Sequence, residues 1–481
     1  MIGKEFDLDV AAHIAQISFT DSWKLMEEAR RRQIIWIKKS GDRCNFVHDK
    51  LRNIFLQKIS LETKKEIHLK LAKILRNRTN ETDFELAYHF DAAGESQEAL
   101  PYALTAAKKA RLQYALETAA QQYRIAERGS QPKDEAVQLE IKEELADVLM
   151  LQGSYPEAKS YFEKAQVLAK TNLDQARIIS KIGEVSHKQG NLETAVKSLE
   201  KALNLLGMRI HHFFPSIMLL LVYEIFIQML HSFFPKRFVA RRSLKGSEKD
   251  LLKVRLLSRL AYSYWFVYNP LRTLFVHFQT LNLAETYPPT LELGQVYSEH
   301  IVAMSLFRLF HRAERYARKS YSIRKRMRDV WGQGQTLAFT SELFYFSSRY
   351  NKAIEKARRA VNVLKRTGDY WEVNIAQWQS AASHYQLGHL REAAEEAEQI
   401  HKLGSQIGDT MAMGVSLDIL SRATKGLVSS QLLKTEMVRP RFDTQVKVQV
   451  LMAEGIRLFY QDKLDESIRL IDRGIQLIKE K

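Results

Sequence analysis

The residues best suited to bind a charged partner form a run of cations between His311 and Arg328. Eight Lys and Arg side chains in this segment accompany a single acid, Glu314. The eight are Arg312, Arg315, Arg318, Lys319, Arg324, Lys325, Arg326 and Arg328. Guanidinium and ammonium groups at this density attract phosphates and carboxylates. The segment is therefore a candidate basic binding surface, although charge runs on helices are also commonly plain solvated faces.

No catalytic or metal-binding pattern accompanies these cations. The sequence has no His-Glu-x-x-His motif, and its single Cys44 excludes a disulfide framework or a cysteine metal site. His48-Asp49 has no nucleophile motif nearby and is expected to belong to a helix. Gly332-Gln-Gly334-Gln lacks the Lys-Ser/Thr of a phosphate loop, so small residues at a helix–helix contact are expected. We predict a protein that is not an enzyme and that has no catalytic, cofactor-binding or metal-binding residues.

The longest apolar run, Phe213 to Phe234, is long enough to span a bilayer, and Lys236 and Arg237 follow it. Glu224, Gln228 and His231 form a polar stripe along it, which disfavours a spanning helix. We expect a helix buried between two helical arrays. The alternatives are a spanning helix and an in-plane helix that docks on a membrane or a partner, which the basic cluster after the run would support.

A repeat of 40 residues indicates the elements that position these groups. Asp329, Asp369 and Asp409 keep this spacing, and each is placed to cap the N-terminus of a helix. Two alanine series, two tryptophans and two tyrosines keep the same register: Ala313/Ala353/Ala393, Ala317/Ala357/Ala397, Trp331/Trp371 and Tyr345/Tyr385. In one unit, Trp371, Ile375, Trp378, Ala382 and Tyr385 share a stripe, and Gly388 ends the helix. Each unit is thus predicted to be a helical hairpin that stacks on its neighbours.

An earlier array and the composition support an all-α chain. Gly153 and Gly190, 37 residues apart, each begin a Gly-x-Tyr/Leu-x-x-Ala turn. Only 9 prolines and 20 glycines occur in 481 residues, which favours long helices over sheets.

The net charge of +17 indicates an acidic partner. The aromatic cluster Tyr262, Tyr264, Trp265, Phe266 and Tyr268 is expected to pack a core in most positions and to line a groove in others.

These turns, with small residues along the following helix, look like tetratricopeptide repeats. The units are longer than the usual length of about 34 residues. They resemble the extended variant in the regulatory superhelix of bacterial maltose-regulon-type activators. The resemblance covers about residues 80–481. It implies an all-α, tetratricopeptide-like helical-repeat solenoid.

The first 78 residues are predicted to form a small winged-helix-like unit. A helical stretch to Arg32 precedes a strand at Ile34–Ile37, a turn at Ser40–Asp42, a second strand and a further helix. Together with Leu86-Ala87-Tyr88-His89-Phe90, this order is similar to the segment after the nucleotide-binding core of bacterial STAND/AAA-type signal-transduction ATPases. No Gly-x-x-x-x-Gly-Lys-Ser/Thr occurs in the sequence, so the resemblance does not imply ATP hydrolysis. It implies the carboxyl part of a larger or split ATPase, or a descendant without the motor.

Four segments follow from these patterns. They are the winged-helix-like unit at 1–78, a first tetratricopeptide-like array at 79–205, an apolar helix with a basic connector at 206–250, and a second array of about 40-residue repeats at 251–481.

The leading functional hypothesis is a non-catalytic scaffold or regulatory module of a bacterial signal-transduction ATPase system. It would bind a protein or small effector on its concave surface, in the cytoplasm, and act with a separate ATPase, kinase or other signalling domain. One alternative is a nucleic-acid-binding regulator that uses the winged-helix-like unit, with Lys50, Arg52 and Lys58, together with the basic patches, although nucleic acid is not the expected partner. The other is a scaffold at the surface of the inner membrane, attached through 213–234.

Overall fold

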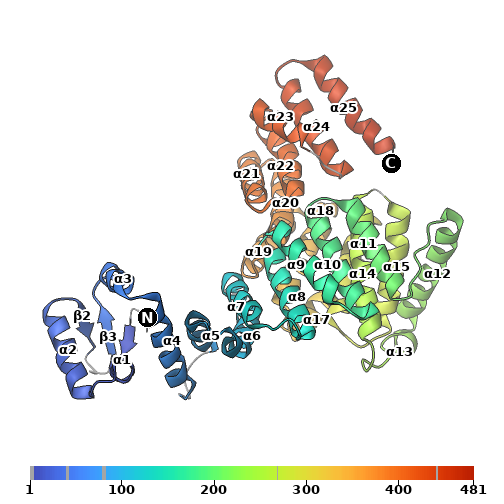
Figure 1. Ribbon diagram of the computed structural model, residues 1–481. Helices are drawn as coiled ribbons and strands as arrows, with labels where there is room; N and C mark the ends of the chain where they lie inside the picture. The colour runs from blue at the N-terminus through green and yellow to red at the C-terminus, as the bar shows by residue number, and fades with distance from the viewer. Residues whose placement is uncertain (1–4, 39–42, 78–82, 268, 440–442, 481) are drawn as a thin grey trace. The chain divides into compact units, whose positions relative to one another are not determined.

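Helices dominate the computed structural model of the chain (Figure 1). It describes residues 5–38, 43–77, 83–267, 269–439 and 443–480. Two compact units result, Met1–Val148 (unit 1) and Leu149–Lys481 (unit 2). The division into four segments remains a prediction.

Unit 1 combines a small sheet with paired helices. Its strands are β1 (Glu5–Asp7), β2 (Ile35–Ile37) and β3 (Arg43–Phe46). Its helices are α1 (Leu8–Ala15), α2 (Phe19–Arg31), α3 (Asp49–Lys58), α4 (Leu61–Arg76), α5 (Asp83–Ala93), α6 (Ser96–Leu112), α7 (Leu116–Gly129) and α8 (Glu135–Leu151), of which the last continues into unit 2.

The sheet of unit 1 has the order β1-β3-β2, with both pairs antiparallel. Leu8 of α1, Ile35 of β2 and Cys44 of β3 are buried together in one apolar cluster. The two predicted strands are confirmed, whereas β1 was not predicted, and the expected single helix to Arg32 is two helices. A left-handed Gln16 (φ 56°) ends α1. The helix expected second in this unit, with Lys50, Arg52 and Lys58, is the third, α3. The turn expected at 40–42 lies outside the described residues, and the winged-helix assignment remains a prediction.

Unit 2 consists of helical hairpins. Its helices are α9 (Tyr155–Leu168), α10 (Asn172–Lys188), α11 (Leu192–Leu205), α12 (Phe214–Phe233), α13 (Pro235–Phe238), α14 (Glu248–Phe266), α15 (Pro270–Glu285), α16 (Leu291–Leu306), α17 (Phe310–Arg326), α18 (Val330–Phe346), α19 (Tyr350–Lys365), α20 (Tyr370–Gln386), α21 (Leu390–Ile407), α22 (Thr410–Ala423), α23 (Ser430–Val438), α24 (Thr444–Phe459) and α25 (Leu464–Lys479).

The predicted repeat is confirmed at its caps and contacts. Asp329, Asp369 and Asp409 cap α18, α20 and α22, each accepting a hydrogen bond from a backbone N–H of the first turn. The alanines of the second helices are buried, because two backbones approach closely there. Gly388 has a left-handed backbone (φ 77°) just after α20, as the helix stop requires. The alternating helices therefore form a stacked solenoid, with α18, α20, α22 and α24 as the first helices of successive hairpins.

The start of unit 2 returns to a much later part of the chain. Lys188, at the end of α10, forms an ion pair with Asp369, the cap of α20, at 3.1 Å and 181 residues away in sequence. Thr410 at the start of α22 donates a hydrogen bond to the carbonyl of Gln189 (3.5 Å). Both Lys188 and Asp369 are buried. The hairpin containing α10 therefore packs against the hairpins that begin with α20 and α22.

The apolar run forms α12, but the expectation that it is buried between two arrays is wrong. Only 22% of its most apolar 18-residue window is buried. Its main packing partner is α15, beside which it lies in Figure 1. The buried side of α12 carries the apolar Ile217 and Leu221 in its first half and the polar Gln228 and His231 in its second half. Most of its other large apolar side chains are exposed.

Candidate ligand-binding cavity

A cavity of about 530 Å³ lies among the helices of unit 2. Its walls come from α14, α15, α16, α18, α20 and α22, and α24 adds Gln445. In a helical-repeat solenoid the stacked helices present an extended concave surface. Trp265, Leu306 and Phe307 line the cavity and remain exposed, so it opens to solvent. The volume is in the range of pockets for small molecules or short peptide segments.

The cavity wall is mainly apolar and aromatic. Tyr262, Trp265 and Phe266 reach it from α14, and Trp371, Ile375 and Trp378 reach it from α20. The stripe predicted from 371, 375 and 378 therefore exists, and it forms the cavity wall. Tyr264 of the predicted aromatic cluster is instead buried and donates a hydrogen bond to Glu200 (2.5 Å). Tyr268 lies outside the described residues.

Three buried polar atoms on cavity-lining residues have no hydrogen-bond partner. They are Trp378 Nε1, Asn374 Oδ1 and Gln379 Oε1. The amide nitrogen of Asn374 is occupied, because it donates to Asp409 Oδ2 (3.1 Å). A buried polar atom without a partner costs about 1–3 kcal/mol. One donor and two acceptors on α20, on residues that line the cavity, are therefore without a partner, and the roles of Asn374 and Gln379 were not predicted.

The charged groups of the cavity are acidic. Glu299, Glu342 and Asp409 line it, and none of the described lining residues is Lys or Arg. Burial raises the pKa of Glu342 to about 7. Burial also raises the pKa of Asp409 to about 6, although hydrogen bonds from Ala412 and Asn374 oppose this. Burial lowers the pKa of His277 to about 4, so this ring is neutral at pH 7. The cavity thus favours a ligand with hydrogen-bond donors or a positive charge.

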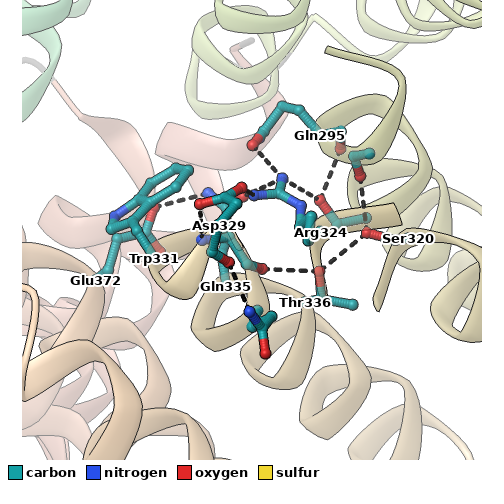
Figure 2. Close-up of polar contacts among 12 residues, drawn as sticks. Gln295, Ser320, Arg324, Asp329, Trp331, Gln335, Thr336 and Glu372 are labelled. Atoms are coloured by element: carbon teal, nitrogen blue, oxygen red, sulfur yellow. Dashed lines mark hydrogen bonds and ion pairs between the residues drawn. The ribbon is translucent and has the colours of Figure 1, made fainter. Parts of the chain in front are cut away.

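A polar network links three hairpins beside the cavity (Figure 2). The guanidinium of Arg324 in α17 donates to Asp329 (3.0 Å), Gln295 of α16 (2.5 Å) and Gln335 of α18 (3.2 Å). Gln335 in turn donates to Glu372 of α20 (2.8 Å). Hydrogen bonds to a charged donor are stronger than neutral ones. The network therefore fixes the spacing of α16, α18 and α20, which supply the cavity wall.

The same network reaches the contact that closes unit 2. Trp331 Nε1 donates to Asp369 (3.1 Å), which also accepts from Lys188. Glu372 is buried next to Asp369, and burial and this carboxylate raise the pKa of Glu372, which the Lys188 ammonium partly offsets. Asp369 stands two residues before the cavity residue Trp371, and Lys188 Nζ lies 5.2 Å from the centre of the Trp371 ring. The Lys188–Asp369 ion pair is therefore close to the cavity wall.

Arg324 does not belong to the predicted basic surface. It is only 1% exposed, and a Cβ on Gly332 would clash with its guanidinium. Gly332 and Gly334 are thus small residues at close contacts, as predicted. Arg312 is half-buried and donates to Ser232 and Tyr316. Six residues of the predicted surface are exposed on α17 and after it: Arg315, Arg318, Lys319, Lys325, Arg326 and Arg328. Their role as a binding surface remains a prediction.

The structure offers no metal centre in the residues it describes. No group of three or more His, Cys, Asp and Glu side chains there is placed to hold an ion. Two buried histidine pairs that the sequence did not reveal are instead hydrogen-bonded to each other, His277 with His300 (2.9 Å) and His68 with His89 (2.8 Å). Burial lowers the pKa of all four rings, so they pack as neutral groups.

Comparison with known proteins finds tetratricopeptide repeats in part of the chain. The family model described as tetratricopeptide repeat matches residues 138–207. No curated protein matches the chain. Among solved structures, the chain is similar to a Signal Transduction ATPase with Numerous Domains (STAND) protein with a tetratricopeptide repeat sensor from Pyrococcus horikoshii. They share 15% identity and a TM-score of 0.40, over 97% of this chain and 63% of that one.

Two further solved structures are similar. One is a Rap protein complexed with competence and sporulation factor, with 12% identity and a TM-score of 0.49, over 80% of this chain and 98% of that one. The other is a human IFIT1 dimer with m7Gppp-AAAA, with 12% identity and a TM-score of 0.37, over 88% of this chain and 97% of that one. At these identities the likeness concerns the fold alone.

The fold is a tetratricopeptide-like helical-repeat solenoid. The predicted resemblance to a STAND protein with such repeats is confirmed as a resemblance. The chain spans 63% of the length of that protein. Repeat solenoids of this kind typically present extended binding surfaces and are typically non-catalytic.

Proposed function

We propose that this chain is a non-catalytic, cytoplasmic scaffold of a bacterial signal-transduction ATPase system, and that unit 2 binds a protein segment or small effector in its cavity. The observation that carries the proposal is the cavity of about 530 Å³ with three unpartnered polar atoms in an aromatic wall. A packed core has no such space, because protein interiors are close-packed. Apolar walls with a few placed polar groups are characteristic of ligand sites.

The chemistry of the wall limits the ligand. Glu342 and the oxygens of Asn374 and Gln379 accept hydrogen bonds, while Trp378 alone of the unpartnered atoms donates. Three of the six tryptophans of the chain line the cavity, namely Trp265, Trp371 and Trp378. Aromatic side chains bind apolar groups and also cations over their faces. The best ligand is therefore a short peptide with an aromatic or aliphatic side chain beside Lys or Arg, or a small effector with the same groups.

Binding of two matched peptide sets tests the proposal. In one set an aromatic residue stands beside Lys or Arg, and in the other Asp or Glu replaces the base. The intrinsic tryptophan fluorescence of the full chain, with titration calorimetry, reports binding. We expect the basic set to bind and the acidic set not to bind. At about pH 8, above the pKa of about 7 of its carboxyl, Glu342→Gln should weaken the basic set by about tenfold or more, because a hydrogen bond to a charged group contributes about 1.5–3 kcal/mol.

A cavity-filling variant provides the structural control. Ala303 lines the cavity and is half-buried, so Ala303→Phe would occupy the space of a ligand. Ser322→Phe adds the same ring on the exposed side of α17. The first variant should abolish peptide binding and the second should leave it unchanged. Failure of both peptide sets to bind, or binding that survives Ala303→Phe, would contradict the cavity as the site.

The signalling role has a separate test. A scaffold without a phosphate-binding loop should fold without nucleotide and should not hydrolyse ATP. Thermal unfolding with and without Mg-ATP and a phosphate-release assay measure both properties. Specific ATP turnover by the purified chain would refute the non-catalytic assignment while leaving the cavity proposal open to its own peptide test.

A further inference from the structure

Helix α12 presents its apolar side to solvent, opposite to the usual arrangement of an amphipathic helix. Eleven large apolar side chains between Phe213 and Phe234 are exposed. They are Phe213, Phe214, Met218, Leu219, Val222, Tyr223, Ile225, Phe226, Met229, Phe233 and Phe234. Leu219, in the middle of this face, is 73% exposed. Contiguous exposed apolar patches of this kind mark interaction sites.

The polar side of α12 is fixed to the protein. Gln228 Nε2 donates to Glu285 of α15 (2.9 Å), and His231 Nδ1 lies 2.8 Å from the same carboxylate oxygen. Tyr297 of α16 donates to the other oxygen of Glu285 (3.0 Å). Farther along, Asn282 donates to the Glu224 carboxylate (2.7 Å). These buried contacts hold α12 by its polar stripe, so turning its apolar face inward would remove the contacts of Gln228 and His231 with Glu285 and leave this carboxylate only Tyr297 among the three.

The surroundings of this face are basic. Between Lys201 and Ser247 the sequence has seven Lys and Arg residues and one acid, Glu224. Five of these cations follow the helix directly and are exposed: Lys236, Arg237, Arg241, Arg242 and Lys245. Arg242 pairs with Asp250 (3.0 Å). All five remain exposed, so the apolar face is flanked by positive charge.

We propose that α12 docks in the plane of an anionic lipid bilayer, with its apolar face in the headgroup boundary and the following basic segment on the acidic lipid headgroups. Helices that bind membranes in this way combine an apolar face with adjacent Lys and Arg. A cationic segment at an anionic leaflet gains about 1 kcal/mol for each Lys or Arg near the surface. A helix of 20 residues provides a contact line about 30 Å long.

Two other occupants fit the charges less well. A second copy of the chain, bound through the same face, would bring two basic segments together. Glu224, the one acid of the region, already accepts a hydrogen bond from Asn282. Like charges at an interface are unfavourable. A spanning α12 would take the polar stripe into lipid and separate it from Glu285. An ionised carboxylate in the bilayer centre costs about 2.5–3.5 kcal/mol or more.

Co-sedimentation of the full chain with vesicles tests the proposal. Vesicles of phosphatidylcholine alone are compared with vesicles that also contain phosphatidylglycerol. We expect binding to the anionic vesicles that weakens steeply with salt. The triple variant Leu219→Asn, Val222→Asn, Phe226→Asn should reduce binding by at least about tenfold, because it removes apolar area from the contact. These side chains are exposed, so the variant should fold.

Matched controls separate this surface from general stickiness. Val167, Leu427 and Val438 are also exposed, and their triple change to Asn should leave vesicle binding unchanged. Neutralising Lys236 and Arg237 to Gln should weaken binding by about fivefold per charge. Alkaline carbonate should release the bound chain, since it lies on the surface.

Several results would overturn the docking proposal. One is the absence of vesicle binding at low salt, and another is full binding by the α12 triple variant. Retention after carbonate treatment would indicate a spanning helix instead. A dimer in sedimentation velocity that the α12 triple variant abolishes would assign the face to a second copy. None of these measurements depends on the cavity or its ligand.

Discussion

Glu342→Gln is the change that most directly tests the electrostatics of the cavity. Glu342 lies on α18 and lines the cavity, where burial raises the pKa of its carboxyl to about 7 from an ordinary value of 4.5. The folded protein therefore holds the Glu342 proton at pH values where the unfolded chain has lost it. The folded state is then destabilised as the pH rises from about 4.5 to about 7.

The expected magnitude follows from these two pKa values. Each tenfold change in proton affinity corresponds to about 1.36 kcal/mol. The penalty for ionised Glu342 is therefore absent below about pH 4.5 and approaches about 3 kcal/mol above pH 7, as an upper value for a group that borders an open cavity. Glutamine keeps the shape and removes the titration. Glu342→Gln should thus be more stable than the wild type at about pH 8 and nearly equal to it at about pH 4.5.

Urea unfolding followed by circular dichroism at several pH values measures this difference. Other buried acids, Asp409 among them, titrate in both proteins, so the difference between the two isolates Glu342. Glu398→Gln, an exposed position on α21, is the control and should show no pH-dependent difference. A wild-type and variant pair whose difference in stability stays constant between about pH 4.5 and 8 would refute the reasoning, because Glu342 would then titrate alike in both states.

Two other changes test the packing of unit 2. Gly332→Ala should lower the free energy of unfolding in urea by about 1–3 kcal/mol, because its Cβ would clash with the Arg324 guanidinium. Gly474→Ala is the control and should be neutral or stabilising, because a Cβ there would lie 3.6 Å from its nearest neighbour. Lys188→Met should cost about 3–5 kcal/mol, because it leaves Asp369 buried without its cation. The double change with Asp369→Asn should cost less than the sum of the single changes, and additive costs in this double-mutant cycle would show that the pair is not coupled.

The repeat could be predicted because its signals are local. A capping Asp must stand directly before its helix, and the alanines must recur wherever two helices cross, so Asp329, Asp369 and Asp409 are recognisable by spacing alone. A left-handed glycine after a helix is a similar signal, and Gly388 confirms it. Local signals of this kind predict where each hairpin begins and how long it is. In the structure α18, α20 and α22 begin directly after the three aspartates.

The cavity could not be predicted, because the stripe that lines it has the same pattern as a core stripe. Trp371, Ile375 and Trp378 recur at helical spacing, and periodicity does not distinguish a wall from a packed interior. Whether an aromatic stripe meets side chains or space depends on the curvature of the whole stack. Glu342, Asn374 and Gln379 are likewise ordinary polar residues until facing helices leave them unpartnered.

Helix α12 was placed wrongly because its partner is distant in sequence. Gln228 is 57 residues from Glu285. The sequence around α12 therefore does not indicate that its polar stripe contacts a buried carboxylate of another helix. Arg324 shows the opposite case. It stands in a run of exposed cations, yet Gly332 leaves the space that its buried guanidinium occupies.

The distribution of charge also predicts how the two proposed contacts respond to salt. The net charge of +17 would repel a cationic ligand at long range, but this repulsion is screened beyond about 8 Å at physiological ionic strength. Inside the cavity the Glu342 carboxylate acts at contact distance with little water between the charges, so binding of a basic peptide should depend weakly on salt. The cations that follow α12 are exposed to solvent, so their attraction to lipid headgroups should fall steeply over the same salt range. If both contacts weakened equally with salt, peptide binding would have to occur on the exposed surface, and the cavity would not be its site.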